Sequence, residues 1–387
     1  MAAPRKGGYR HLIYFIDGTW LWAGSQNTLD VYSNIYRINT LLNADATDGH
    51  AQIIHYSRGV GAIGGMRRYF DGGFSSGIDV MIADLYVNLC CNYQPNDRIY
   101  IFGFSRGAVV ARAFAGLIAK GILEDNHINM FAHVWAAYVG DAQVLVSGFN
   151  DDGSRTKEDA VDYKPFCSET DPKIEFLGVF ETVSGGGRGL VADAQRIRIE
   201  ARRLQANVKN ALQLLAIDET RAVFSPIMWT GLEPPPPGQE GSFMEQIWMP
   251  GVHSDVGGAY ENRILGDIAL ITMIDRAKAK TKLGFDMKEV RKHNQKLLSP
   301  TNVRIHNEYA NKYWYLASPW RVARSLNPNI IDQSIHPLGN YVQGKTVRYK
   351  VKKDLFNYHL PLGFMPPGYQ LKQAPEFLTE DFESIFS

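Results

Sequence analysis

The sequence predicts an α/β fold, with a mostly parallel central sheet and helices on both of its faces. Short apolar runs typical of buried strands alternate along the chain with longer segments that have helical periodicity. Where strands and helices alternate in this way, successive strands run parallel and the helices between them cover the sheet. The 387 residues contain neither an internal repeat nor a flexible linker, so we expect one elaborated domain.

The first third of the chain predicts three strands and the helices that connect them. The run "HLIYFI" is typical of a buried strand and ends at Asp17, Gly18 and Thr19. A helix follows, because Val31, Ile35 and the next apolar residues recur at helical intervals. The further elements of this part are a strand over 51–57, a helix over 77–93, a strand over 96–104 and a helix over 106–123.

The remainder of the chain is less regular. "KIEFLGVFETV" predicts another buried strand, and we expect a long helix from Ala194 to Ile217. "MEQIWM" is typical of a strand, and the segment over 265–280 has helical periodicity. Beyond about Lys282 the pattern weakens.

Composition and charge exclude several classes of protein. The 41 Lys and Arg residues balance the 40 Asp and Glu residues, so no positive field points to nucleic acid. The three cysteines include an adjacent pair but no Cys-x-x-Cys, which favours neither a disulfide framework nor a metal site. The sequence shows no signal peptide and no apolar run of the ~20 residues that span a bilayer. We expect a cytoplasmic protein without metal or cofactor, although secretion without a cleaved signal would leave no such mark.

The segment "GFSRG" places Ser105 between a strand-like run and a helix-like run. It fits the G-x-S-x-G pattern of a nucleophile elbow, a sharp turn that exposes a serine hydroxyl at the carboxyl edge of a sheet. Gly103 and Gly107 suit such a turn because side chains two residues either side of the serine would collide. The alternative is a tight strand-to-helix turn in which the serine is incidental.

A serine that transfers acyl groups needs a base to take its proton. Among ten histidines, His253 has the best setting, in the loop "PGVHSDVGGAY" just past a predicted strand. Gly251, Gly257 and Gly258 allow that loop an irregular backbone. The alternative is a hydrogen-bonded loop or core histidine without a catalytic role.

The base in turn needs an acid that holds its ring in the correct tautomer. Glu181 ends a buried strand, where a charged group is costly unless it is paired. Asp255 is the rival, but it lies two residues from His253 in the same loop, so we expect it to organise that loop instead. Asp17 is a distant third candidate.

An acyl-transfer site also needs two backbone N–H groups for the oxyanion. We expect one from Arg106, directly after the nucleophile, and the second from Gly18 or Thr19 in the loop after the first strand. The simplest role for Asp17 is to accept hydrogen bonds that hold this loop.

Together these motifs resemble a specific family. In order along residues 9–280, they are "YFIDGTW", "YSRGVGAIGG", "IYIFGFSRGA", "GVFETV", "NALQLLAIDETRAVFSPIMW", "WMPGVHSDVGGAY" and "LGDIAL". The chain is similar to the α/β-hydrolase domain of the type VI secretion phospholipase effectors and their uncharacterised relatives. The resemblance implies a catalytic triad at Ser105, Glu181 and His253 and hydrolysis of ester bonds in glycerophospholipids.

Two features depart from the family pattern. The family usually has aspartate where this chain has Glu181, whose extra methylene must enter the site from a different backbone position. The effectors also carry large extra segments, so a chain ending at Ser387 is expected to be a stand-alone enzyme. We predict an α/β-hydrolase catalytic domain over 9–285 and a C-terminal extension over 286–387 packed on the same domain.

Three functions therefore remain open. The first is a phospholipase of the A type, and the second is a serine esterase that acts on soluble or polymeric esters. The third is a hydrolase fold used for binding or assembly, with a triad weakened by the longer acid. A lipase would touch a bilayer, and "NMFAHVWAAYV" and "YWYLASPWRVARSL", with Arg321 and Arg324, resemble interfacial segments. Core-packing helices are the equally open alternative for both segments.

Overall fold

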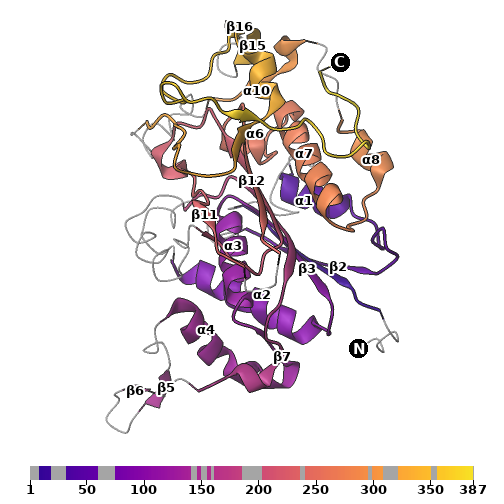
Figure 1. Cartoon of the computed structure of the whole chain (residues 1–387), viewed down its shortest axis with the longest axis vertical. Helices are drawn as coiled ribbons and strands as arrows, with labels where there is room; N and C mark the ends of the chain where they lie inside the picture. Colours follow the sequence, from indigo (N-terminus) through magenta and orange to yellow (C-terminus); the bar gives the residue numbers. More distant parts are fainter. Residues whose placement is uncertain are drawn as a thin grey trace.

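The computed structural model describes residues 8–18, 32–59, 75–140, 146–149, 155–157, 161–184, 203–235, 240–294, 299–307, 321–349 and 355–386. At its centre lies an eight-stranded sheet in the order β17-β14-β12-β10-β8-β3-β1-β2 (Figure 1). Every pairing described in this sheet is parallel, which confirms the predicted fold class. In the same order, the strands are Lys372–Gln373, Gln333–Ile335, Phe243–Met249, Asn210–Ala216, Ile174–Phe180, Arg98–Phe104, His11–Ile16 and Gln52–Ser57.

The central strands are apolar along almost their whole length. All six residues of β1 are buried, and β3, β8 and β10 are each buried at six of seven positions. A strand covered on both faces has no solvent-facing side, so it reads as a continuous hydrophobic run rather than an alternating one. This is why these strands stand out in the sequence.

Helices cover both faces of the sheet (Figure 1). On one face α2, α3 and α4 form a core with the strands, and all 13 residues of α3 are buried. On the other face α1 and α7 pack against each other and the sheet. The helices are α1 (Asn34–Thr40), α2 (Ser75–Asn92), α3 (Arg106–Ile118), α4 (Phe131–Val139), α6 (His253–Val256), α7 (Ile264–Lys280), α8 (Met287–Arg291) and α10 (Pro337–Val342).

The strand order reverses between β1 and β3. From β1 the chain adds β2 on one side, and it then returns to add β3 and the later strands on the other side. The last residue of β1, Ile16, pairs with Ser57 of β2 and Gly103 of β3, so these carboxyl ends lie level. Parallel α/β sheets bind their ligands in the crevice outside such a reversal.

The predicted helix from Ala194 to Ile217 is wrong over its last part. Asn210–Ala216 forms β10, between β8 and β12, and Arg203–Leu204 forms the short strand β9. Alanine, leucine and glutamine favour a helix locally, but burial between two parallel strands overrides that preference. The helix predicted over 106–123 is also too long, since α3 ends at Ile118 and Ile122–Leu123 forms β4.

The C-terminal part of the chain continues the same sheet and core. Strands β14 and β17 extend the sheet beyond β12, and α10 packs with the face that carries α7. Small sheets surround the main one; their strands are β4 with β7 (Cys167–Glu169), β5 (Val146–Phe149) with β6 (Arg155–Lys157), β9 with β11 (Gly231–Leu232), and β13 (Arg304–Ile305) with β15 (Thr346–Tyr349) and β16 (Leu355–Asn357).

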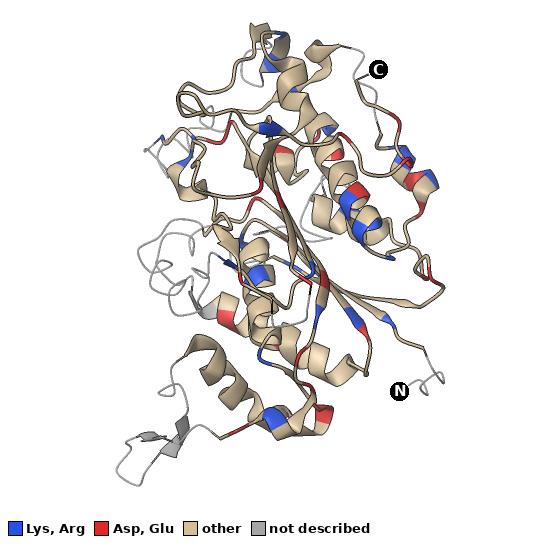
Figure 2. Ribbon diagram, viewed as in Figure 1, with Lys and Arg blue, Asp and Glu red and all other residues tan. Residues whose placement is uncertain are grey.

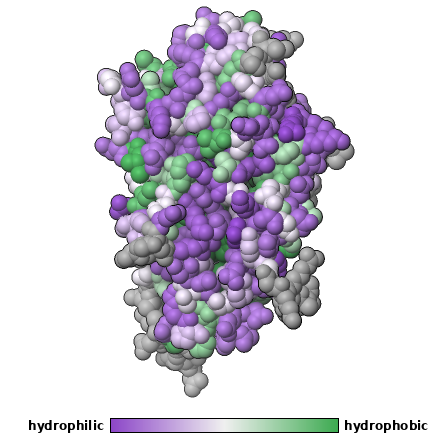
Figure 3. Space-filling view, turned by 45° about the vertical axis from the view of Figure 1, so that its right-hand side comes forward, coloured by the Kyte–Doolittle hydropathy of each residue, from purple (hydrophilic) through white to green (hydrophobic). Residues whose placement is uncertain are grey.

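The surface carries both signs of charge without a strong bias. Basic and acidic residues are interspersed over the elements drawn in Figure 2, and the net charge of the chain is +1. On the face shown in Figure 3, hydrophobic residues lie in small groups among hydrophilic ones. Among the helices that the structure describes, none is both long enough and apolar enough to cross a membrane.

Candidate active site

The turn between β3 and α3 holds Ser105 in a backbone conformation that few non-glycine residues adopt, with φ of 59° and ψ of −124°. A Cβ on Gly103 would lie 2.7 Å from the backbone of Ala108, and one on Gly107 would lie 2.3 Å from the carbonyl oxygen of Asp17. Both positions therefore require glycine. The turn has the geometry of a nucleophile elbow.

His253 is the first residue of α6, a single helical turn rather than the irregular loop that the sequence predicted. Its Nε2 lies 2.9 Å from Ser105 Oγ, and its Nδ1 lies 3.2 Å from Glu181 Oε2. The ring packs against Phe104 and Phe224, with centroid distances of 4.8 and 4.7 Å. These contacts restrict the orientation of the imidazole and contribute to its burial.

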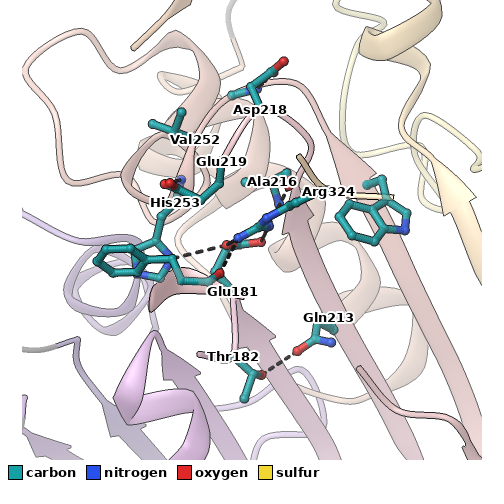
Figure 4. Close-up of polar contacts among 12 residues, drawn as sticks. Glu181, Thr182, Gln213, Ala216, Asp218, Glu219, Val252, His253 and Arg324 are labelled. Atoms are coloured by element: carbon teal, nitrogen blue, oxygen red, sulfur yellow. Dashed lines mark hydrogen bonds and ion pairs between the residues drawn. The ribbon is translucent and has the colours of Figure 1, made fainter. Parts of the chain in front are cut away.

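Glu181 directly follows β8 and is fully buried, with φ of 47°. Figure 4 shows its carboxylate between His253 and Arg324. Burial by itself would raise the pKa of Glu181, but the charge of Arg324 and the hydrogen bonds from His253 and Arg324 outweigh it and lower this pKa to about 2. Because Glu181 is a carboxylate, the Nδ1–H of His253 donates to it, and Nε2 is left to accept from the Ser105 hydroxyl.

Burial also controls the protonation of His253. It lowers the pKa of His253, while the hydrogen bond and charge of Glu181 and the charge of Glu219 act in the opposite direction. The ring is therefore neutral at neutral pH, which is the state that can take up a proton.

Asp255, the rival acid, belongs to a different pair. Its Oδ1 lies 2.5 Å from Nδ1 of His306, and its Oδ2 accepts from the backbone N–H groups of Val252 and His306 at 2.9 and 3.2 Å. Asp255 thus ties the turn that carries His253 to the segment after β13.

The predicted oxyanion donors are only partly placed. Arg106 begins α3 directly after Ser105, where the helix N-terminus presents its positive end. The Gly18 N–H donates to Asp17 Oδ1 at 2.7 Å, so in this structure it is directed to that carboxylate rather than to an oxyanion. Thr19, the other predicted donor, lies outside the described residues.

Asp17 is buried at the end of β1 and holds the neighbouring chain. Its Oδ2 accepts from the Tyr56 hydroxyl at 2.6 Å, and Oδ1 accepts from Gly18. Burial raises the pKa of Asp17, against the hydrogen bonds from Tyr56, Ser33 and Gly18. Its contacts join β1, β2 and the start of α1.

Two charged residues at the site were missed by sequence reasoning. Arg324 donates to both oxygens of Glu181, at 2.6 and 2.7 Å, and Glu219 accepts from the backbone N–H of His253 at 3.2 Å. Glu219 lies in "NALQLLAIDETRAVFSPIMW", one of the motifs shared with the family, but the sequence predicted no role for it. Of the two alternatives that the sequence left open for the segment of Arg324, the membrane interface is wrong for this residue, because its side chain is buried on Glu181.

The aromatic segments proposed for membrane contact have different outcomes. Residues 308–320 lie outside the described residues, and they include the first part of "YWYLASPWRVARSL". In the segment of α4, Phe131, Trp135 and Val139 are partly buried and pack against the core of the α3 face. Core packing therefore accounts for these side chains of α4.

The described residues can also be compared with the requirements of a metal site. Within the described part of the chain, no group of three or more His, Cys, Asp or Glu side chains is arranged to hold a metal ion. Ser105, His253 and Glu181 lie together beside the N-terminus of α3.

A parallel sheet with a serine elbow after one strand, and an acid and a histidine after later strands, defines the α/β-hydrolase fold. Residues 10–276, more than half of the chain, match the family described as "T6SS, Phospholipase effector Tle1-like, catalytic domain". The chain belongs to this family, which confirms the resemblance of its motifs. Membership supports an ester hydrolase.

Individual relatives are distant. A protein of Saccharomyces cerevisiae, described as uncharacterized, is 28% identical in an alignment of 244 residues that covers 57% of this chain and 33% of the yeast protein. An uncharacterized Pseudomonas aeruginosa protein of known structure has a TM-score of 0.42 and 18% identity over 72% of this chain and 47% of its own. The Tle1 effector, solved bound to the VgrG spike of the type 6 secretion system, has a TM-score of 0.34 and 21% identity over 66% of this chain and 52% of its own. The chain thus spans about a third of the yeast relative and about half of these two structures.

Proposed function

We propose that the protein is a serine ester hydrolase of the phospholipase A type, which cleaves an acyl ester of glycerophospholipids through Ser105, His253 and Glu181. The observation that carries the proposal is the continuous path from Ser105 Oγ through the His253 ring to Glu181, with steps of 2.9 and 3.2 Å. Membership of a phospholipase effector family supports a lipid ester as the substrate.

In the first half-reaction, Ser105 Oγ attacks the carbonyl carbon of the ester while its proton passes to Nε2 of His253. The tetrahedral intermediate carries a negative oxygen, which the N–H of Arg106 and the N-terminus of α3 stabilise. When the intermediate collapses, the carbon–oxygen bond to the lysophospholipid breaks. The leaving oxygen takes the proton back from His253, and an acyl group remains on Ser105.

In the second half-reaction a water molecule gives its proton to Nε2 of His253 and attacks the acyl carbon. The new tetrahedral intermediate expels Ser105 Oγ, which recovers a proton from His253, and the fatty acid leaves. Glu181 remains a carboxylate in both halves. It holds the Nδ1–H tautomer and stabilises the imidazolium that forms in each transition state.

The test compares fatty-acid release from mixed phospholipid vesicles with hydrolysis of a soluble short-chain ester. Ser105→Ala is expected to reduce turnover of vesicle lipid by at least about 10³-fold, because the nucleophile is removed. The matched control is Ser168→Ala, since Ser168 is an exposed serine on β7 whose hydroxyl donates to the Ile122 carbonyl. This variant should keep wild-type activity.

Each outcome separates the three functions that the sequence left open. Vesicle hydrolysis that is lost in Ser105→Ala supports the phospholipase. Hydrolysis of the soluble ester alone would assign the protein to the esterases. Folded wild-type protein that turns over neither substrate would contradict an ester hydrolase and favour a binding role.

A further inference from the structure

The carboxylate of Glu181 is held more closely by Arg324 than by His253. The two guanidinium nitrogens of Arg324 lie 2.6 Å from Oε1 and 2.7 Å from Oε2, whereas His253 Nδ1 lies 3.2 Å from Oε2. The backbone N–H of Ala216 donates to Oε1 at 2.5 Å. A planar guanidinium that grips both oxygens fixes the orientation of a carboxylate as well as its place.

Arg324 is itself anchored independently of Glu181. Its Nη1 donates to the carbonyl of Ala216 at 2.6 Å (Figure 4). Its Nη2 donates to the carbonyl of Phe224 at 2.7 Å, and only 6% of the residue is exposed. The guanidinium is therefore a fixed part of the frame formed by the end of β10 and the η5 turn (Ala222–Phe224). A flexible surface arginine could not orient a buried acid in this way.

Glutamate needs such a frame more than a shorter acid does. Its side chain turns about three bonds, and Glu181 starts from a backbone φ of 47°, which its neighbours must enforce. With the carboxylate free to rotate, Oε2 would meet His253 Nδ1 only part of the time. The contacts of Arg324 remove that freedom.

The charges that face His253 come in compensated pairs. Glu181, after β8, pairs with Arg324; Glu219, after β10, pairs with Arg221 at 2.6 Å. On α6 itself, Asp255 pairs with His306. The partly buried Asp218, next to Glu219, accepts from Gly251 N–H at 2.6 Å and from the Tyr358 hydroxyl at 3.3 Å. Both acids that contact His253 thus have an arginine of their own.

We propose that Arg324 is a positioning residue of the triad, which orients the Glu181 carboxylate toward His253 Nδ1 and partly neutralises its negative charge. This inference rests on the proposed function of Ser105, His253 and Glu181. This partial neutralisation has a direct consequence. Without Arg324 the full charge of Glu181 would act on the imidazole, favour the imidazolium and keep the base protonated up to a higher pH.

The test measures kcat and KM against pH for the wild type, Arg324→Lys and Arg324→Gln. Arg324→Gln should lower kcat roughly 10- to 100-fold, as loss of a supporting group commonly does, with KM little changed. The acidic limb of kcat/KM should move up by about 1 pH unit or more, because an unbalanced charge beside a titrating group shifts it by that much. Arg324→Lys keeps the charge, so its kcat should fall while its acidic limb stays near that of the wild type.

Arg276→Gln is the matched control. Arg276 is also buried, and it donates to the carboxylate of Asp275 and to the carbonyls of Pro375 and Glu376. Its Nε lies 3.6 Å from a second carboxylate oxygen, Oε2 of Glu245, and none of these groups contacts His253. Its loss should destabilise the fold without moving the acidic limb. The proposal would be overturned if the acidic limb of kcat/KM stayed in place in Arg324→Gln, or if it moved by the same amount in both Arg324 variants. If Arg324→Gln does not fold, Arg324→Lys alone can still overturn the proposal. It would do so if its acidic limb of kcat/KM moved up by about 1 pH unit or more.

A second readout needs no substrate. NMR titration of the His253 imidazole in the folded Ser105→Ala protein, with and without Arg324→Gln, should show His253 losing its proton at a higher pH when Arg324 is replaced. If Ser105 proves not to be the nucleophile, the proposed function fails while this titration still reports on Arg324. If the titration is unchanged while Ser105→Ala abolishes activity, only the role of Arg324 fails.

Discussion

Two buried histidine–carboxylate pairs lie side by side in this protein. His253 contacts Glu181 at 3.2 Å, and His306 contacts Asp255 at 2.5 Å, although His253 and Asp255 are only two residues apart on α6. By distance alone the second pair is the closer one. A search for a histidine beside an acid would therefore choose the wrong pair.

What each imidazole contacts besides its carboxylate decides which histidine can act as a base. Nε2 of His253 meets Ser105 Oγ at 2.9 Å, whereas the ring of His306 stacks on Tyr260 at a centroid distance of 3.8 Å. Only the first histidine connects a carboxylate to a hydroxyl that can be activated. The acid of the triad is therefore identified by the group on the far side of its histidine.

The largest expected effect is the difference in kcat between variants of Glu181 and of Asp255. Glu181→Gln should reduce kcat by about 10²- to 10⁴-fold, because an amide neither holds the required tautomer nor stabilises the imidazolium. Asp255→Asn, which preserves shape in the same manner, should reduce kcat by less than about 10-fold. Steady-state kinetics on vesicle lipid would measure both, and a larger loss in Asp255→Asn would reverse the assignment of the acid.

A moderate effect on stability is expected at the second pair. His306→Leu leaves the buried carboxylate of Asp255 without its imidazole donor, which should cost about 1–3 kcal/mol of unfolding free energy. His306→Gln keeps a donor and should restore part of that loss. Urea denaturation of the three proteins would measure the difference. A loss of kcat as large as that of Glu181→Gln, in protein that remains folded, would show that His306 takes part in catalysis.

The smallest effects concern the pH dependence of stability. With its pKa lowered from 4.5 to about 2, Glu181 stabilises the fold fully above pH 4.5, and that contribution is lost as the pH falls toward 2. Asp218 behaves oppositely: burial, against the donors Gly251 and Tyr358, raises its pKa from 3.8 to about 7, so its contribution to stability declines as the pH rises across that window. Glu181→Gln should flatten the first slope and Asp218→Asn the second, in unfolding free energies measured against pH. Equal slopes in both variants and the wild type would contradict the difference between an acid with an arginine partner and one whose hydrogen-bond donors are uncharged.

The elbow was predictable because its sequence pattern is local. The two glycines lie within two residues of Ser105, and the buried strand before them is continuously apolar. The structure shows that Gly103 is required by Ala108 in the same turn, and Gly107 by the distant end of β1. The position of Glu181 followed from the cost of placing a charge at the end of a buried strand. Such signals are contained in short stretches of sequence.

What could not be predicted depends on contacts between distant segments. Arg324 reaches Glu181 from 143 residues away, in a segment whose aromatic and basic residues were equally compatible with a membrane surface and with core packing. Its guanidinium is recognisable only once β8 and β10 are adjacent. The error at Asn210–Ala216 has the same origin, because residues that favour a helix become a strand when β8 and β12 enclose them.

The distance between Glu181 and Arg324 along the chain also sets an order of events during synthesis. Residues 10–276, which carry Ser105, Glu181 and His253, leave the ribosome before Arg324 does. Until then the carboxylate at the end of β8 has no guanidinium to balance it, and burying it alone is costly. On the proposed role of Arg324, the active centre would be complete only after a residue outside the segment that matches the family has been synthesised.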